Sequence, residues 1–291
     1  MTQENQTPIT KNFIDLEKVI ASKSKHLARF MPGFVLWYLK RVIHQEELND
    51  FLYKNRHYHG LDFVAAIISE FNIDIRVKGI ENLPKTGPQI LVSNHPLGGL
   101  DGIALMHIIG KIRKDFIFPV NDLLLFIPNM KDLFLPINKH GKNTQNIRLF
   151  DRAFSSEQLI LYFPAGLVSR KKKGVIKDLE WKKTFLSKAR KYKRDVIPVH
   201  IGGKNSNFFY RLANLRSALK IKANIEMLYL VDEMFKHQDN SIPITIGKPI
   251  PYTYFDPQKQ KDKAWAQTVK KQVYALGENA PLPIPTEDLK K

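Results

Sequence analysis

The 291-residue sequence contains no cysteine. This excludes disulfides, thiolate metal sites and a cysteine nucleophile. The sequence also lacks an apolar run of the roughly 20 residues that a membrane-spanning helix needs, because its longest apolar stretch covers only residues 30–39. A signal peptide is not expected, since the polar start has no basic stretch followed by an apolar run. Any role at a membrane is therefore predicted to be peripheral.

Acidic residues are scarce relative to basic ones. There are 28 Asp and Glu against 46 Lys and Arg, a formal net charge of +18. This charge predicts attraction to a polyanion, such as nucleic acid, an anionic membrane face or an acidic carrier protein. No helix-turn-helix, zinc-finger or aromatic strand motif accompanies it, so a basic nucleic-acid-binding protein is the less favoured alternative. His57 and His59 have His-x-His spacing but no His-Glu-x-x-His motif, and no metal site is expected.

Apolar residues make up 43% of the chain, enough for a sizeable core. Residues 1–72 predict an N-terminal helical extension that associates with a membrane, and residues 256–291 predict a C-terminal helix and tail. Between them, in residues 73–255, short apolar runs alternate with helical patterns. This alternation predicts an α/β fold whose mixed, largely parallel sheet is covered by helices. Strands are expected near 73–78, 89–93, 116–120, 133–137, 158–163 and 196–201, and helices near 102–112, 143–154, 177–192 and 261–276.

The most informative stretch follows the second expected strand and reads SNHPLGGLD over residues 93–101. Gly98 and Gly99 allow the chain to reverse sharply between His95 and Asp101, which opens the next helix. A histidine oriented by a carboxylate can remove a proton from a hydroxyl or amine while that atom attacks a thioester. Alternatively, Asp101 only caps the helix and His95 is an ordinary loop histidine.

A second strand ends at Phe163 and leads through Pro164, Ala165 and Gly166 to cations that begin at Arg170. Open α/β sheets usually bind ligands beyond the carboxyl ends of their strands. This stretch is therefore suited to an anionic head group. The alternative is an ordinary exit from a strand, with lysines that only contact water.

Together, these stretches resemble the signature blocks of the lysophospholipid, or glycerolipid, acyltransferase superfamily. The resemblance covers about residues 78–250 and rests on the order and spacing of several blocks. The matching residues are Asn94, His95 and Asp101 for the first block, 135–139 in the place of the second, 163–166 for the third and 196–199 for the fourth.

By this resemblance, residues 73–255 form an acyltransferase catalytic domain with a glycerolipid acyltransferase-like fold. His95 is the general base, Asp101 is its partner, and the co-substrate is an acyl thioester on acyl carrier protein or coenzyme A, with no other cofactor. The remaining site residues implied are Asn94, Gly98 and Gly99 as supports of the motif, and Lys139, Phe163, Pro164, Gly166, Ser169 and Arg170 for binding the acceptor.

The sequence departs from the usual blocks in ways that bear on the acceptor. Five residues, not four, separate His95 from Asp101, and Ala165 stands where a glutamate is usual. Arg170 lies four residues past Gly166 instead of two, and the second block offers only Lys139. The sequence resembles more closely the hemolysin-like branch associated with lyso-ornithine and other amino-acid lipids. The expected acceptor is therefore a lyso-amino-acid lipid or an amino acid, and the alternative is 1-acylglycerol-3-phosphate in phospholipid synthesis.

Basic residues are concentrated between Arg170 and Arg194, with twelve Lys or Arg and two acids. Trp181 and Phe185 recur there at helical spacing, which predicts a helix with aromatics in the core and lysines toward lipid. The residues expected at an anionic membrane are Phe34, Trp37, Lys171, Lys172 and Lys173. The expected location is peripheral, on the cytoplasmic face of the inner membrane.

Overall fold

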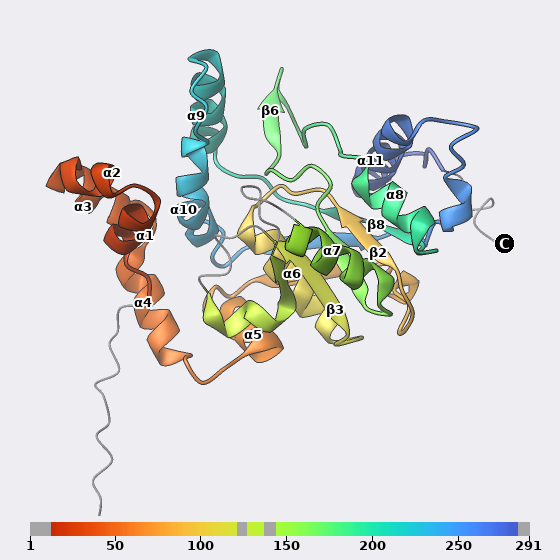
Figure 1. Cartoon of the computed structure of the whole chain (residues 1–291), viewed down its shortest axis with the longest axis horizontal. Helices are drawn as coiled ribbons and strands as arrows, with labels where there is room; N and C mark the ends of the chain where they lie inside the picture. The colour runs from red at the N-terminus through yellow and green to blue at the C-terminus, as the bar shows by residue number, and fades with distance from the viewer. Residues whose placement is uncertain (1–12, 121–126, 137–143, 285–291) are drawn as a thin grey trace, which may run out of the picture.

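A computed structural model describes residues 13–120, 127–136 and 144–284 of the protein (Figure 1). Four helices at the start form an arm beside the main body (Figure 1). They are α1 (Leu16–Lys23), α2 (Lys25–Phe30), α3 (Gly33–Val42) and α4 (Gln45–Lys54). The next helix, α5 (Gly60–Glu70), packs on α6 (Gly99–Gly110), and Phe63 and Val64 lie in the main core. The main core therefore includes helices that precede residue 73, and Leu52 of α4 is buried in it as well.

Within the described residues, seven strands form one sheet in the order β1-β9-β8-β2-β5-β3-β4. All neighbouring strands pair in parallel except β8 and β9, which are antiparallel. The mixed, largely parallel sheet expected from the sequence is confirmed, although β9 was not expected. The strands are β1 (Asp74–Lys78), β2 (Ile90–Ser93), β3 (Phe116–Val120), β4 (Phe134–Pro136), β5 (Leu159–Tyr162), β8 (Val196–Ile201) and β9 (Ser241–Ile246).

Helices cover both faces of this sheet. Successive side chains on a strand point to opposite faces, and on β2 Leu91 faces the core under α5 and α6, whereas Ile90 and Val92 face the second core. Burial on both faces explains why these strands are continuous apolar runs. The other helices are α7 (Thr144–Ser155), α8 (Thr184–Lys191), α9 (Asn207–Ala218), α10 (Leu230–Phe235) and α11 (Asp262–Glu278), with short 3-10 turns η1 (Ile80–Asn82), η3 (Pro128–Leu133), η4 (Ile225–Tyr229) and η5 (Tyr252–Tyr254).

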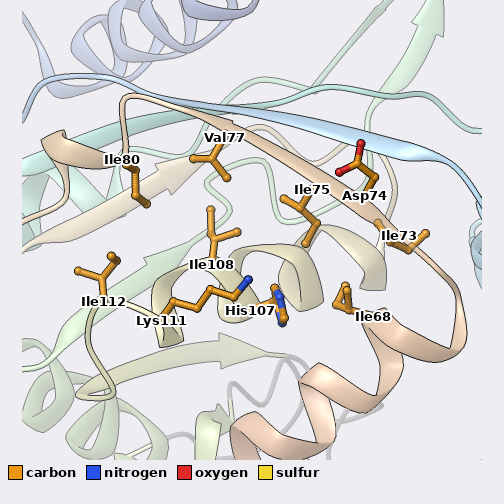
Figure 2. A pocket seen from close by; sticks show the side chains of 10 residues that line it. All are labelled: Ile68, Ile73, Asp74, Ile75, Val77, Ile80, His107, Ile108, Lys111 and Ile112. Atoms are coloured by element: carbon orange, nitrogen blue, oxygen red, sulfur yellow. The ribbon is translucent and has the colours of Figure 1, made fainter.

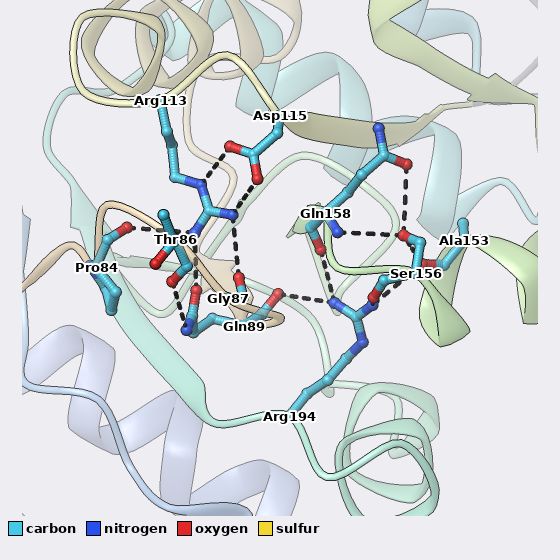
Figure 3. A network of polar contacts seen from close by, with 10 residues as sticks. All are labelled: Pro84, Thr86, Gly87, Gln89, Arg113, Asp115, Ala153, Ser156, Gln158 and Arg194. Carbon is cyan, nitrogen blue, oxygen red and sulfur yellow. Dashed lines mark hydrogen bonds and ion pairs between the residues drawn. The ribbon is translucent and has the colours of Figure 1, made fainter.

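Two buried arginines fasten the loops at the end of the sheet where β2, β3 and β5 begin (Figure 3). Arg194 donates hydrogen bonds to backbone carbonyls that include those of Phe154 at 2.6 Å and Gln158 at 2.7 Å. Burial lowers the pKa of Arg194 to about 10. Arg113 pairs with Asp115 at 2.6 Å and also donates to loop carbonyls. These arginines stabilise the loops at the amino ends of the strands, whereas the His95 loop follows the carboxyl end of β2.

The helix expected over residues 177–192 is wrong in its first half. Residues 170–177 form an antiparallel hairpin of β6 (Arg170–Lys172) and β7 (Val175–Lys177), so the hairpin includes the first residue of the expected helix. Lys173 and Gly174 have positive φ angles of 49° and 81°, which reverse the chain tightly. Trp181 then enters the core before α8 begins at Thr184. The predicted burial of Trp181 and Phe185 is confirmed.

Candidate active site

Asn94 fixes the loop that follows β2. Its Nδ2 donates to the carbonyl of Ile201 at 2.7 Å, and its Oδ1 accepts from the Ile201 N–H at 2.7 Å. Ile201 ends β8, the parallel neighbour of β2, so the buried amide extends the strand pairing by one more step. Asn94 therefore sets where His95 leaves the sheet.

His95 and Asp101 form a hydrogen-bonded pair. The His95 Nδ1 lies 2.8 Å from the Asp101 Oδ2, and Asp101 is fully buried at the third position of α6. The same oxygen accepts the backbone N–H groups of Leu97 at 2.8 Å and Gly98 at 3.1 Å. Five residues separate His95 from Asp101 where four are usual. Gly98 has a φ angle of 83°, so the chain accommodates the additional residue in a turn that glycine adopts readily. The contact inferred from the sequence is confirmed.

The pair leaves one ring nitrogen of His95 for chemistry. An ionised carboxylate only accepts hydrogen bonds, so Nδ1 donates to Asp101 and Nε2 is the basic nitrogen. Within the described residues, Nε2 has no hydrogen-bond partner, and the ring is 17% exposed. Burial raises the pKa of Asp101 above its ordinary value, and the hydrogen bond from His95 is the largest opposing effect. This is the arrangement of a histidine general base with an orienting carboxylate.

Phe163 lies against the histidine ring. The two ring centroids are 4.2 Å apart and the planes are tilted by only 14°, so the rings are stacked. A turn follows, in which the Gly166 N–H donates to the Phe163 carbonyl at 3.0 Å and Gly166 has a φ angle of 66°. Pro164 occupies the same turn. The Pro and Gly of this stretch therefore hold Phe163 where it restricts rotation of the His95 ring.

A second buried carboxylate, Asp178, supports the loop from the other side. Its Oδ1 accepts the backbone N–H of His95 at 3.2 Å and the Ser169 hydroxyl at 2.5 Å. Its Oδ2 accepts the Trp181 Nε1–H at 2.8 Å, and the Ser169 N–H donates to the His95 carbonyl at 2.7 Å. Sequence reasoning missed Asp178. The available signal was that Asp178 is one of only two acids within a strongly basic segment.

One of the two cations predicted to bind an acceptor has a buried carboxylate partner. Arg170, predicted to bind the acceptor, is buried, and its guanidinium pairs with Glu226 at 2.7 Å. Burial lowers the pKa of Arg170, and the Glu226 charge opposes this. The hydroxyl of Ser169 is likewise committed to Asp178. Lys139 lies outside the described residues.

The residues predicted to meet a membrane lie on two separate elements. Phe34 and Trp37 are exposed on α3, and Lys171, Lys172 and Lys173 lie on the β6–β7 hairpin. Among the helices that the structure describes, none has the length and apolar character to span a bilayer.

A hollow of about 350 Å³ lies apart from these residues, between β1, α5 and the C-terminal half of α6 (Figure 2). Its walls are largely isoleucine, with His107, Lys111 and Asp74 at the surface (Figure 2). None of the predicted site residues contributes to it. Among the described residues, no three His, Asp or Glu side chains gather in the manner of metal ligands.

Comparison with known proteins identifies the class. The family model described as acyltransferase matches residues 18–280, which include the arm, the sheet and the site loops. The protein is thus an acyltransferase, an enzyme that transfers acyl groups. The chain belongs to the acyltransferase family, and the resemblance to the lysophospholipid acyltransferase superfamily is confirmed.

Two similar relatives carry the same name. The chain is 47% identical over 265 residues to a lyso-glycine lipid O-acyltransferase of Bacteroides thetaiotaomicron, covering 90% of this chain and 97% of that protein. It is 46% identical over 265 residues to a lyso-glycine lipid O-acyltransferase of Phocaeicola vulgatus, covering 90% and 95%. A crystal structure of the 1-acyl-sn-glycerophosphate acyltransferase PlsC of Thermotoga maritima matches with a TM-score of 0.47 at 17% identity, covering 91% of this chain and 95% of that one.

Proposed function

We propose that this protein transfers a fatty acyl group from a thioester to the hydroxyl of a lyso-glycine lipid at an anionic membrane surface. The observation that carries the proposal is the His95–Asp101 pair, with its 2.8 Å hydrogen bond and a free Nε2. The names of the two relatives support the acceptor and the oxygen as the atom that is acylated.

The chemistry needs one proton transfer in each direction. His95 Nε2 takes the proton of the acceptor hydroxyl while the oxygen attacks the thioester carbonyl, so that a C–O bond forms. The C–S bond then breaks, and the imidazolium returns the proton to the departing thiolate. Asp101 keeps Nδ1 protonated and stabilises the imidazolium that exists between the two transfers.

The charges near the site favour a carboxylate head group over a phosphate. The glycine of a glycine lipid carries at most one negative charge, whereas the phosphate of lysophosphatidic acid carries close to two. A phosphate is best held by a planar arginine fork, but the Arg170 guanidinium is already paired with Glu226. This supports a lyso-amino-acid lipid as the preferred acceptor.

The donor and the location are part of the same proposal. A thioester on either coenzyme A or acyl carrier protein suits the chemistry, and the net charge of +18 suits both an acidic carrier and an anionic bilayer. We place the enzyme peripherally on the cytoplasmic face of the inner membrane. Exposed Phe34 and Trp37 on α3 and the lysines of the hairpin support this placement.

The test is a direct comparison of acceptors. Purified protein in mixed micelles receives acyl-CoA or acyl carrier protein with lyso-glycine lipid, lysophosphatidic acid or free glycine at equal concentration, and released thiol is measured. Lyso-glycine lipid should be acylated fastest, at oxygen, with His95→Ala as the inactive control. A clear preference for lysophosphatidic acid would contradict the proposal and indicate a role in phospholipid synthesis. Amide formation on glycine would contradict O-acylation.

A further inference from the structure

We infer that α9 is a membrane-binding helix, which lies on the anionic bilayer together with α3. The inference deepens the proposed function, since it names a further surface through which the enzyme reaches its lipid acceptor. It rests on an apolar row that we call the α9 stripe, made of Phe208, Leu212, Leu215 and Leu219.

The α9 stripe is one continuous helical face that the described residues leave largely uncovered, with only Phe208 packed edge-on against Tyr229. Its members recur at the i, i+4, i+7 and i+11 spacing that places side chains on one side of a helix. Phe208, Leu215 and Leu219 are 49%, 57% and 62% exposed, and Leu212 is half-buried. Large apolar side chains gathered on one exposed face mark an interaction surface, in contrast to single exposed ones.

The opposite face of α9 is fixed to the body, so the exposure of the stripe does not come from a loose helix. Phe209 and Tyr210 are buried in a small core with Val168. At the start of the helix, the Ser206 hydroxyl caps the Phe209 N–H at 3.2 Å and donates to Glu233 at 2.6 Å. The stripe is therefore held in a defined orientation.

The charge of α9 identifies the partner as an anionic surface. Residues 207–222 contain four Lys or Arg and no acid. Arg216 pairs with Glu226, whereas Arg211, Lys220 and Lys222 are exposed and contact no carboxylate within the described parts of the chain. An apolar stripe flanked by free cations is typical of helices that lie in the interface of an anionic membrane.

The stripe also continues the aromatic surface of α3. The ring of Phe208 lies edge-on to that of Tyr229 at 5.0 Å, and the Tyr229 hydroxyl lies 2.9 Å from the Tyr38 hydroxyl on α3. On the other side, Lys171 of the hairpin donates to Asn207 at 2.9 Å, and Figure 1 shows α9 and β6 projecting together. The arm, α9 and the basic hairpin therefore form one surface.

This surface lies at the edge of the sheet that carries the candidate site. The parallel strands β2 and β8 end at Ser93 and Ile201, so His95 and the start of α9 both follow carboxyl ends of neighbouring strands. The hairpin follows β5, whose carboxyl end lies at the same edge. A bilayer seated on α9 would thus lie on the side of the protein from which a lyso lipid can reach His95.

Sedimentation with vesicles tests the inference and needs neither donor nor acceptor, so its outcome is independent of which lipid is acylated. Wild-type protein is compared with Leu215→Gln/Leu219→Gln and with the single variant Leu219→Gln. The matched control is Ile112→Gln, because Ile112 is exposed but lies beyond the far end of α6, just before β3 begins. Vesicles rich in phosphatidylglycerol and vesicles of phosphatidylcholine are used, and melting of each variant is recorded.

The double variant should bind phosphatidylglycerol vesicles about 10- to 100-fold more weakly than wild type, from the loss of two leucine insertions. The affinity of the single variant for vesicles should lie between those of wild type and the double variant, and Ile112→Gln should bind like wild type. Unchanged vesicle binding by a double variant with native melting would overturn the inference. So would a dimer of the wild type that the double variant dissociates in the absence of vesicles, since a second copy would then cover the stripe.

Discussion

Replacing Asp101 by Asn removes the charge beside His95 while nearly preserving the size of the side chain. The Asp101 Oδ2 accepts three hydrogen bonds, from His95, Leu97 and Gly98. An asparagine can keep an oxygen at that place, but its NH₂ group then occupies the place of Oδ1, for which the described residues offer no hydrogen-bond partner. A buried amide without an acceptor costs about 1–3 kcal/mol of unfolding free energy. The fold should survive, because domains are stable by about 5–15 kcal/mol.

The effect on catalysis should be much larger than the effect on stability. An amide does not stabilise the imidazolium, and an amide turned the other way would force the proton onto Nε2, where it blocks the base. Turnover should fall on the order of 10²- to 10⁴-fold. Thiol release at saturating donor gives the rate, and circular dichroism gives the melting temperature.

A charge-matched control is Asp115→Asn, which neutralises an exposed carboxylate paired with Arg113 away from the site. It should leave turnover within about threefold of wild type. Turnover by Asp101→Asn within that same range, in a folded protein, would refute the catalytic pairing. A variant that melts early but turns over normally would show that Asp101 only caps α6.

Four further outcomes are expected. His95→Ala should lose on the order of 10²- to 10⁴-fold in turnover with near-native melting, and normal thiol release would contradict its role as the base. Asp178→Asn should lower unfolding free energy by about 1–3 kcal/mol in urea titrations, since its amide would face donor groups; an unchanged midpoint would count against the network. Gly98→Ala should cost about 1–3 kcal/mol, because its φ of 83° is unfavourable for alanine; native-like melting would contradict this. Glutamate at all three of residues 171–173 should weaken vesicle binding at low salt. The difference from wild type should shrink at molar salt, where charges are screened beyond about 3 Å. If the variant binds vesicles as well as wild type at low and at high salt, binding depends on the apolar surfaces instead.

The parts of the structure that were predictable from sequence are those fixed by local pattern. Continuous apolar runs such as residues 90–92 predict strands buried on both faces, and the expected strands lie close to those observed. The contact of His95 with Asp101 was predictable because a glycine turn joins a strand to a helix within seven residues. Local geometry alone sufficed there.

The missed features depend on partners far along the chain. Asp178 contacts His95 across 83 positions, which no local spacing reveals. Strand β9 contains Pro243, a residue that argues against a strand in a single sequence. Its place between β1 and β8 follows only from the assembled sheet. The pairing of Arg170 with Glu226 could not be foreseen either, because this buried partner lies 56 residues later.

The position of β9 also sets an order of events during synthesis. Among the strands that the structure describes, β1 pairs with β9 alone, and Asp74 lies opposite Ser241. The ribosome therefore adds about 170 residues after β1 before its partner exists, which takes roughly 10–30 s at ordinary rates of synthesis. Over that interval, β1 has an unpaired edge, and the arm that precedes it is joined to an unfinished body. The first helices are thus complete before the sheet is closed, so the nascent chain exposes an edge of β1 that β9 covers in the folded protein.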